Sequence, residues 1–167
     1  DLSGYLSDEE LGQYVDSYIE EGRIAADGSL RIFPTAKSTE IMMINKTDWE
    51  KFAAATGASL DDLATIEGIT STAQAYYEWT DSLTPDIMQD GKAFYGRDAV
   101  ANYFVIGMQQ LGVEIFHVEN GKMTLNVPEQ ELYRLWENYY VPMVKGYFGA
   151  YGSFRSDDVK TGALLAY

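Results

Sequence analysis

The segment DGSLRIFPTAKSTEIMMINK, which covers Asp27–Lys46, decides how this chain is organised. A glycine turn leads into a short apolar run near Leu30–Phe33, which stops at Pro34, and a second apolar run covers Thr39–Ile44. Proline cannot donate to a sheet ladder, so Pro34 is expected to mark the point where the chain leaves one sheet. Because no reversing turn joins the two runs, the pattern predicts two strands in different bodies, with the chain crossing between them.

The composition is that of a folded, acidic protein. The chain has 167 residues, 46% of them apolar and 14% aromatic, which is enough for one domain with a sizeable core. A net charge of −14 argues against nucleic acid or an anionic membrane surface as the main partner. The absence of cysteine excludes disulfide and thiol chemistry. No apolar run approaches the roughly 18 residues of a membrane span.

Capping signals and apolar spacing predict the helices and the short strands. A capping box at Ser7–Glu10 opens an apolar stripe, which predicts one helix that ends near Gly22. The other predicted elements are helices over Thr47–Gly57, Leu63–Thr80, Asp98–Leu111 and from Pro128 onward with a break at Pro142, strands at Ala93–Tyr95 and Ala163–Tyr167, and a hairpin of Val113–Val118 with Met123–Leu125 around an Asn-Gly turn.

Several motifs, taken in order, resemble the extracellular solute-binding proteins of ABC importers, the maltose-binding-like class. The segment around Pro34 is similar to the first crossing between the two lobes of that family. Three further stretches continue the resemblance, namely NKTDWEKF at Asn45–Phe52, KAFYGRDAVANY at Lys92–Tyr103 and FRSDDVKTGALLAY at Phe154–Tyr167. The last is similar to the family's return strand, and we expect the chain to be a piece of a longer secreted protein.

The resemblance implies an α/β fold with a small mixed sheet flanked by helices, one lobe of a two-lobed binding protein of the type II periplasmic class. Residues 1–36 would be a remnant of the first lobe with a hinge strand, and residues 37–167 the second lobe. The implied function is capture of a small solute, most often a sugar, between the lobes for delivery to an ABC permease. The implied location is extracellular, as a cell-surface lipoprotein or in the periplasm, without enzymatic activity or cofactor.

The segment Tyr95-Gly96-Arg97-Asp98 is the first candidate for ligand contact. Gly96 lets the backbone turn and a ligand approach closely, the following helix presents unpaired N–H groups, and Arg97 adds a fork of donors. In the family this position lines the cleft between the lobes. The competing interpretation is structural: Asp98 caps the helix, and Arg97 is an exposed side chain paired with it.

A second candidate patch, Ser38-Thr39-Glu40, offers hydroxyls and a carboxylate at the crossing between lobes. Its alternative is a polar hinge satisfied by its own backbone. The predicted ligand-binding set is completed by Asn102, Tyr151 and Arg155. Among the aromatic residues, those at helical spacing are better explained by core packing, whereas four in a glycine-punctuated loop are expected to face a cleft: Tyr147, Phe148, Tyr151 and Phe154.

Two other function classes stay open on the sequence. One is a cell-surface module whose acidic, aromatic surface binds another protein. The other is a fragment of a carbohydrate-active enzyme, which would need facing carboxylates, whereas the pairs Asp61-Asp62 and Asp157-Asp158 are adjacent and do not face each other. His117, the single histidine, has too few neighbours for a metal site and is expected to be an exposed strand residue.

Overall fold

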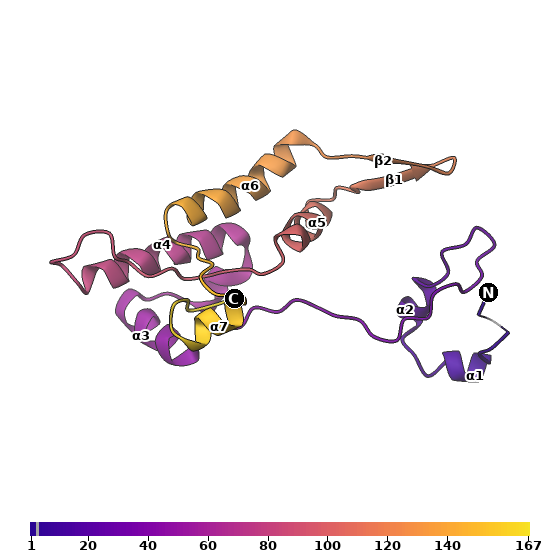
Figure 1. Cartoon of the computed structure of the whole chain (residues 1–167), viewed down its shortest axis with the longest axis horizontal. Helices are drawn as coiled ribbons and strands as arrows, with labels where there is room; N and C mark the ends of the chain where they lie inside the picture. Colours follow the sequence, from indigo (N-terminus) through magenta and orange to yellow (C-terminus); the bar gives the residue numbers. More distant parts are fainter. Residues whose placement is uncertain (3) are drawn as a thin grey trace. The chain divides into compact units, whose positions relative to one another are not determined.

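The computed structural model describes residues 1–2 and 4–167. The chain forms two compact units, Asp1–Ile41 and Met42–Tyr167, each of which is described here by itself (Figure 1). No helix in the described residues is long and apolar enough to cross a bilayer.

The first unit contains two short helices, α1 (Asp8–Leu11) and α2 (Asp16–Glu20). The predicted capping box is confirmed at the start of α1, where the Ser7 N–H donates to the Glu10 carboxylate at 2.8 Å. The prediction of one continuous helix is wrong, because the chain turns between Gly12 and Val15. Glycine is a poor helix former, and Val15 adopts an extended backbone as the residue before α2.

The predicted strand at Leu30–Phe33 does not form in this unit. Instead, the backbone N–H groups of Arg31 and Ile32 both donate to the carbonyl of Gly22. Within this run only Leu30 is buried, together with Ile19 of α2, whereas Ile32 is 55% exposed.

A minimal mixed sheet of four short segments lies at the centre of the second unit. Tyr95 bridges in parallel to both Phe148 and Ala166, and Ala166 bridges antiparallel to Ile44. The Ala166 N–H donates to the Phe94 carbonyl at 2.8 Å. The predicted small mixed sheet is therefore confirmed, although the runs at Thr39–Ile44, Ala93–Tyr95 and Ala163–Tyr167 shrink to single bridges, because each segment turns away after a few ladder bonds.

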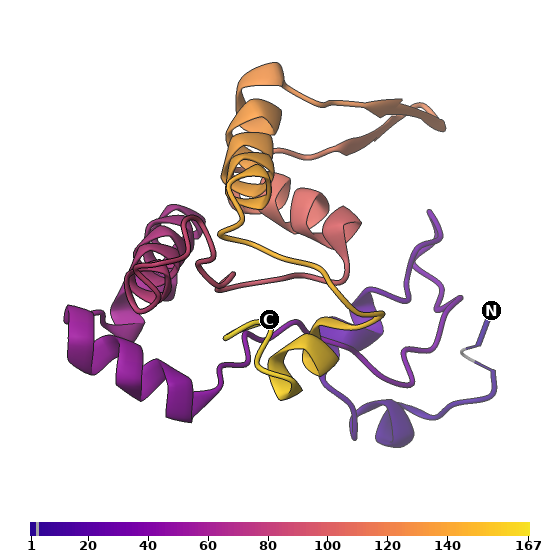
Figure 2. The same cartoon turned by 60° about the vertical axis from the view of Figure 1, so that its left-hand side comes forward.

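Helices surround these central segments, and the C-terminal segment runs between them (Figure 2). α4 packs on α3 and on α6, and α6 packs on α5. Asn45 caps the start of α3, and Gly57 ends it in the left-handed conformation. The helices of this unit are α3 (Lys46–Thr56), the 3₁₀ helix η1 (Leu60–Ala64), α4 (Ile66–Ser82), α5 (Val100–Gln110), α6 (Glu129–Val144) and α7 (Arg155–Lys160).

Two helix predictions need correction, because α5 begins at Val100, two residues later than expected, and α7 was not predicted. α6 contains Pro142 and ends two residues later at Val144, in agreement with the expected local end at this proline. Pro142 lies in the last turn of α6. Its carbonyl accepts hydrogen bonds from the backbone N–H groups of Tyr147 and Phe148, which follow the helix.

The core is aromatic. Phe52 and Phe94 are fully buried, and Tyr76 meets both rings nearly edge to face, at centroid distances of 5.3 and 5.6 Å. This geometry is favoured because the positive ring edge meets the negative ring face. A second cluster joins α5 to α6 through Tyr103 and Leu135.

The predicted hairpin is confirmed as β1 (Phe116–Glu119) paired antiparallel with β2 (Lys122–Leu125). Asn120 and Gly121 have φ values of 50° and 73°, as an Asn-Gly turn requires. All residues of both strands are exposed, which also holds for His117 as expected.

The aromatic core gives a direct stability test. Phe94→Ala removes a fully buried ring that contacts Trp49 and Tyr76, so we expect a loss of about 3–5 kcal/mol in the free energy of unfolding. Phe116→Ala is the matched control, because that ring is 53% exposed and should change stability by less than about 1 kcal/mol. Urea denaturation measures both, and equal effects would contradict the assigned core.

Candidate functional site

The carboxyl ends of three parallel central segments meet at one edge of the sheet. The Gly149 N–H donates to the Tyr95 carbonyl at 2.9 Å, and the Gly96 N–H donates to the Ala166 carbonyl at 3.2 Å. Past this point the chain continues as Arg97–Asp98, as the loop after Gly149 and as Tyr167. In α/β proteins the crevice outside the carboxyl ends of the strands is where ligands bind.

Two glycines allow the backbones at this edge to approach closely. A Cβ atom on Gly96 would lie 2.4 Å from the Gly149 carbonyl oxygen and 2.8 Å from Cδ of Arg155. A Cβ atom on Gly149 would lie 2.8 Å from the ring of Tyr151. At Gly96 the space next to the backbone is filled by the chain itself, and the close approach of a ligand there stays a prediction.

Arg97 lies against an aromatic wall built from α5 and α6. Its guanidinium carbon is 5.5 Å from the ring centroid of Tyr103, which is a cation–π distance. Burial lowers the pKa of Arg97, while Tyr103 and Tyr139 oppose that shift. The Tyr103 hydroxyl donates to the Leu135 carbonyl at 2.8 Å, and burial raises its pKa to about 12. The wall therefore stays neutral around the cation at physiological pH.

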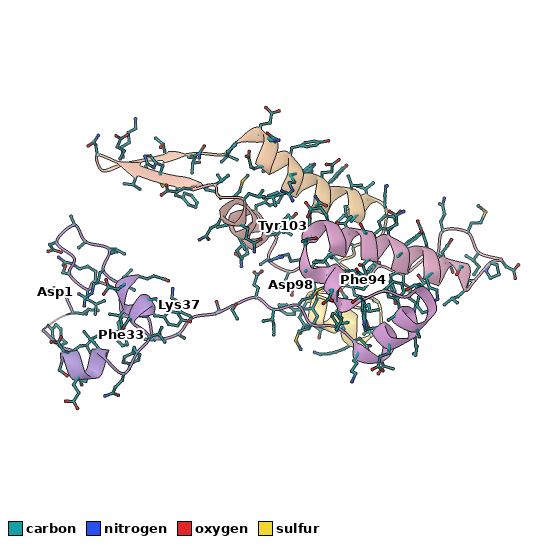
Figure 3. The ribbon with its side chains drawn as sticks, turned by 180° about the vertical axis from the view of Figure 1, so that it is seen from behind. Asp1, Phe33, Lys37, Phe94, Asp98 and Tyr103 are labelled. Carbon is teal, nitrogen blue, oxygen red and sulfur yellow. The ribbon has the colours of Figure 1, made fainter. Side chains whose placement is uncertain are left out.

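Asp98 is exposed and pairs with the buried Arg155 instead of capping the helix. Its carboxylate accepts the backbone N–H of Arg155 at 3.0 Å and the Nε–H of the same residue at 3.2 Å. The N-cap of α5 is Ala99, which makes no side-chain capping bond. The interpretation of Asp98 as a helix cap is therefore wrong. Figure 3 marks Asp98 between Phe94 and Tyr103 along this part of the chain.

Arg155 joins that carboxylate to the neighbouring loop. Its side chain is only 5% exposed, its Nη1 lies 3.0 Å from the Asp158 carboxylate, and its Nη2 donates to the Gly152 carbonyl. Asp158 in turn accepts the N–H groups of Tyr151 at 3.1 Å and Gly152 at 2.8 Å. Burial alone would raise the pKa of Asp158, but these two hydrogen bonds and the Arg155 charge outweigh it and lower the pKa.

The structure brings most of the predicted site residues to this edge. Asp98 and Tyr151 are exposed, as is Asn102 on the first turn of α5, and Arg97 is half-buried; Tyr95, Gly96 and Arg155 are buried. Ser38, Thr39 and Glu40 are exposed, extended residues of the first unit, and their predicted role remains a prediction.

The loop aromatics divide between the surface and the interior. Tyr151 and Phe154 are 63% and 61% exposed. The expectation that Phe148 faces a cleft is wrong: it is buried, with its ring 5.2 Å from that of Tyr95. Tyr147 is partly buried beside Tyr77.

Sequence reasoning missed three residues of this region, namely Tyr103, Tyr139 and Asp158. The tyrosines have helical spacing, which is equally typical of core residues. Asp158 is adjacent to Asp157, and because successive helical residues point about 100° apart, one carboxylate turns inward while the other pairs at the surface with Lys160. An Arg-x-x-Asp spacing on one helix face was the signal available.

Within residues 1–2 and 4–167, no group of three or more His, Cys, Asp or Glu side chains is arranged to hold a metal ion. His117 lies 3.6 Å from Glu114 on the exposed hairpin side.

Comparison with known protein families assigns the whole of this fold. The sequence model of the bacterial extracellular solute-binding proteins matches residues 2–167. The chain belongs to this family. Separate comparisons with curated proteins and with solved structures gave no match. Members of the family bind small solutes outside the cytoplasm and work with ABC transporters, so extracellular or periplasmic solute binding is the general function of this chain.

The close approach at Gly96 predicts a strong effect of one methyl group. Gly96→Ala forces the Gly149 backbone or the sheet register to move, so we expect a loss of about 1–3 kcal/mol in stability and shifted amide resonances in the loop after Gly149. Gly4→Ala is the control, because a Cβ atom there meets nothing within 4 Å. Unchanged loop resonances in Gly96→Ala would contradict the packing described.

The acidic limb of the stability curve tests Asp158. A pKa that is lower in the folded than in the unfolded state means that the unfolded chain binds more protons, so the contribution is fully present above pH about 4 and is lost as pH falls below it. Asp158→Asn should therefore make stability fall less steeply between pH 4 and pH 2. Asp157→Asn, an exposed neighbour on α7, is the matched control. Urea titrations across this pH range would decide, and identical slopes in all three proteins would refute the assignment.

Proposed function

We propose that the carboxyl edge of the central sheet in residues 42–167 is the solute-contacting face of this solute-binding protein. The observation that carries the proposal is the convergence of three parallel segment ends, lined by Arg97 and an ordered glycine loop, at the place where α/β proteins bind ligands. In this role the chain binds its solute without chemical change and hands it to the permease of an ABC transporter.

Exposure assigns different roles to the predicted residues. Arg97, Asp98, Asn102 and Tyr151 are accessible and contact the solute. Tyr95, Gly96 and Arg155 are buried and give the edge its shape. The role of Ser38, Thr39 and Glu40 as solute contacts stays a prediction from the sequence.

A sugar is the solute that we propose first. The exposed ring of Tyr151 can stack on the C–H face of a pyranose, and the carboxylate, amide and guanidinium groups around it match sugar hydroxyls. An acidic solute is the second candidate, because Arg97 presents a planar cation suited to a carboxylate. The two candidates differ in how they depend on Arg97.

The test is an NMR titration of the isotope-labelled protein with glucose, maltose, glucuronate and acetate. We expect at least one sugar to shift the amides of residues 97–102 and 149–154, with no shift in the hairpin at 116–125. Resonances of the solute itself should be unchanged after prolonged incubation. Shifts confined to other surfaces, or none with any of the four, would contradict the proposed face.

Two variants separate a neutral from an acidic solute. Tyr151→Ala should weaken binding of a neutral sugar roughly fivefold through loss of stacking, whereas Tyr133→Ala, a comparably exposed tyrosine on α6, should leave it unchanged. Arg97→Gln should weaken an acidic solute at least about tenfold and a neutral one less. Calorimetric titration measures the affinities, and equal behaviour of Tyr151→Ala and Tyr133→Ala would exclude Tyr151 from the site.

A further inference from the structure

Arg155 connects two loops that begin where a pair of hydrogen-bonded central segments ends. On one side it holds Asp98, which precedes α5, through its backbone N–H and its Nε–H. On the other side it holds the loop that carries Tyr151, through the Gly152 carbonyl and the Asp158 carboxylate. The same carboxylate binds the N–H groups of that loop, so one guanidinium and two carboxylates fix both loops.

We propose that Arg155 is a positioning residue for solute binding, which sets the placement of Tyr151 relative to Asp98 without touching the solute. This inference rests on the proposed function of the edge. Its geometric basis is that Arg155 is 5% exposed, whereas Asp98 and Tyr151, on either side of it, are exposed. Arg155 is therefore buried beside two of the residues proposed to contact the solute, Asp98 and Tyr151.

Arginine is better suited than lysine to hold two loops at once. The planar guanidinium offers donors in fixed directions: Nε donates to Asp98 and Nη2 to the Gly152 carbonyl, while Nη1 lies 3.0 Å from the Asp158 carboxylate as an ion pair. A lysine ammonium would keep the charge but not this geometry.

A contribution to stability alone does not account for the cluster. Removing charges from water is costly, and a buried ion pair is often no more stabilising than apolar side chains of the same volume. Fixing one arrangement of the two loops favours solute binding instead of folding stability. A preorganised surface avoids the entropy cost of ordering those loops when a solute binds. Gly149 and Gly152 give the loop backbone freedom that the cluster removes.

The first measurement needs no solute. In Arg155→Met and Arg155→Lys, we expect amide hydrogen exchange of Tyr151 and Gly152 to rise at least tenfold, with unchanged exchange of Phe94 in the core. Lys160→Met is the control, because that side chain lies on the same helix but is 73% exposed. Unchanged exchange at Tyr151 and Gly152 would overturn the inference.

The second measurement uses whichever of glucose, maltose, glucuronate and acetate binds the unmodified protein most tightly. We expect both Arg155 variants to bind it at least tenfold more weakly, with Lys160→Met unaffected. Asp158→Asn combined with Arg155→Met should bind no more weakly than Arg155→Met alone, because Asp158 and Arg155 hold the same loop as one unit and neither is proposed to touch the solute. A purely structural role would couple the two substitutions in unfolding experiments but not in affinity.

The outcomes separate the inference from the function on which it rests. If the unmodified protein binds one of the solutes and Arg155→Met binds it equally well, the positioning role is refuted while the proposed function stands. If the unmodified protein binds none of them, the proposed function fails and the inference fails with it, whatever the exchange rates show.

Discussion

The backbone of Phe94–Gly96 hydrogen-bonds to segments on both of its sides, and the rest of the second unit depends on this pairing. Phe94 donates to Tyr147 on one side and accepts from Leu165 and Ala166 on the other. Because the three segments are parallel, each must be joined to the next by a crossover. α5 and α6 lie in the connection from Tyr95 to Phe148, and α7 lies in the connection from Phe148 to Ala166. The short central pairing thus places helices around itself and gathers the ends of its segments at one edge.

The shortness of these segments is compensated by aromatic packing. Single bridges offer few ladder bonds, so the stability of the centre comes from the rings that cover it. Phe94 and Tyr95 point to opposite faces of the segment. Phe94 meets the rings of Trp49 and Tyr76, and Tyr95 meets that of Phe148. Buried aromatic side chains such as Phe52, Phe94 and Phe148 therefore serve the interior, whereas Tyr151 and Phe154 remain exposed.

At that edge the protein combines freedom and constraint. Glycines let the backbones come within contact distance, and the ionic cluster around Arg155 restricts the loop that the glycines would otherwise leave mobile. The chain carries a net charge of −14, whereas this edge holds Arg97 against neutral tyrosines. Arg97 is therefore a local positive charge in an acidic protein.

The sequence determined the features that depend on neighbouring residues. The capping boxes at Ser7 and Ser59, the Asn45 cap and Gly57 end of α3, and the Asn-Gly hairpin all follow from local chemistry, and all are present. The order of motifs was also sufficient to indicate the family, since it does not depend on geometry. Most residues of the candidate site, namely Tyr95–Asp98, Asn102, Tyr151 and Arg155, were named from the sequence, and their contact with a solute stays a prediction.

Tertiary structure decided what depends on residues far apart in the chain. Asp98 and Arg155 are 57 positions apart, and no local rule distinguishes an aspartate that caps its own helix from one that binds a distant arginine. Whether an apolar run becomes a strand depends on a partner for its ladder, which Ile44 finds in Ala166, while Leu30–Phe33 forms no strand ladder. Packing likewise decided that Asp158 and Phe148 are buried while Asp157 and Tyr151 are exposed. A side chain is buried by its neighbours in space and not by its neighbours in sequence.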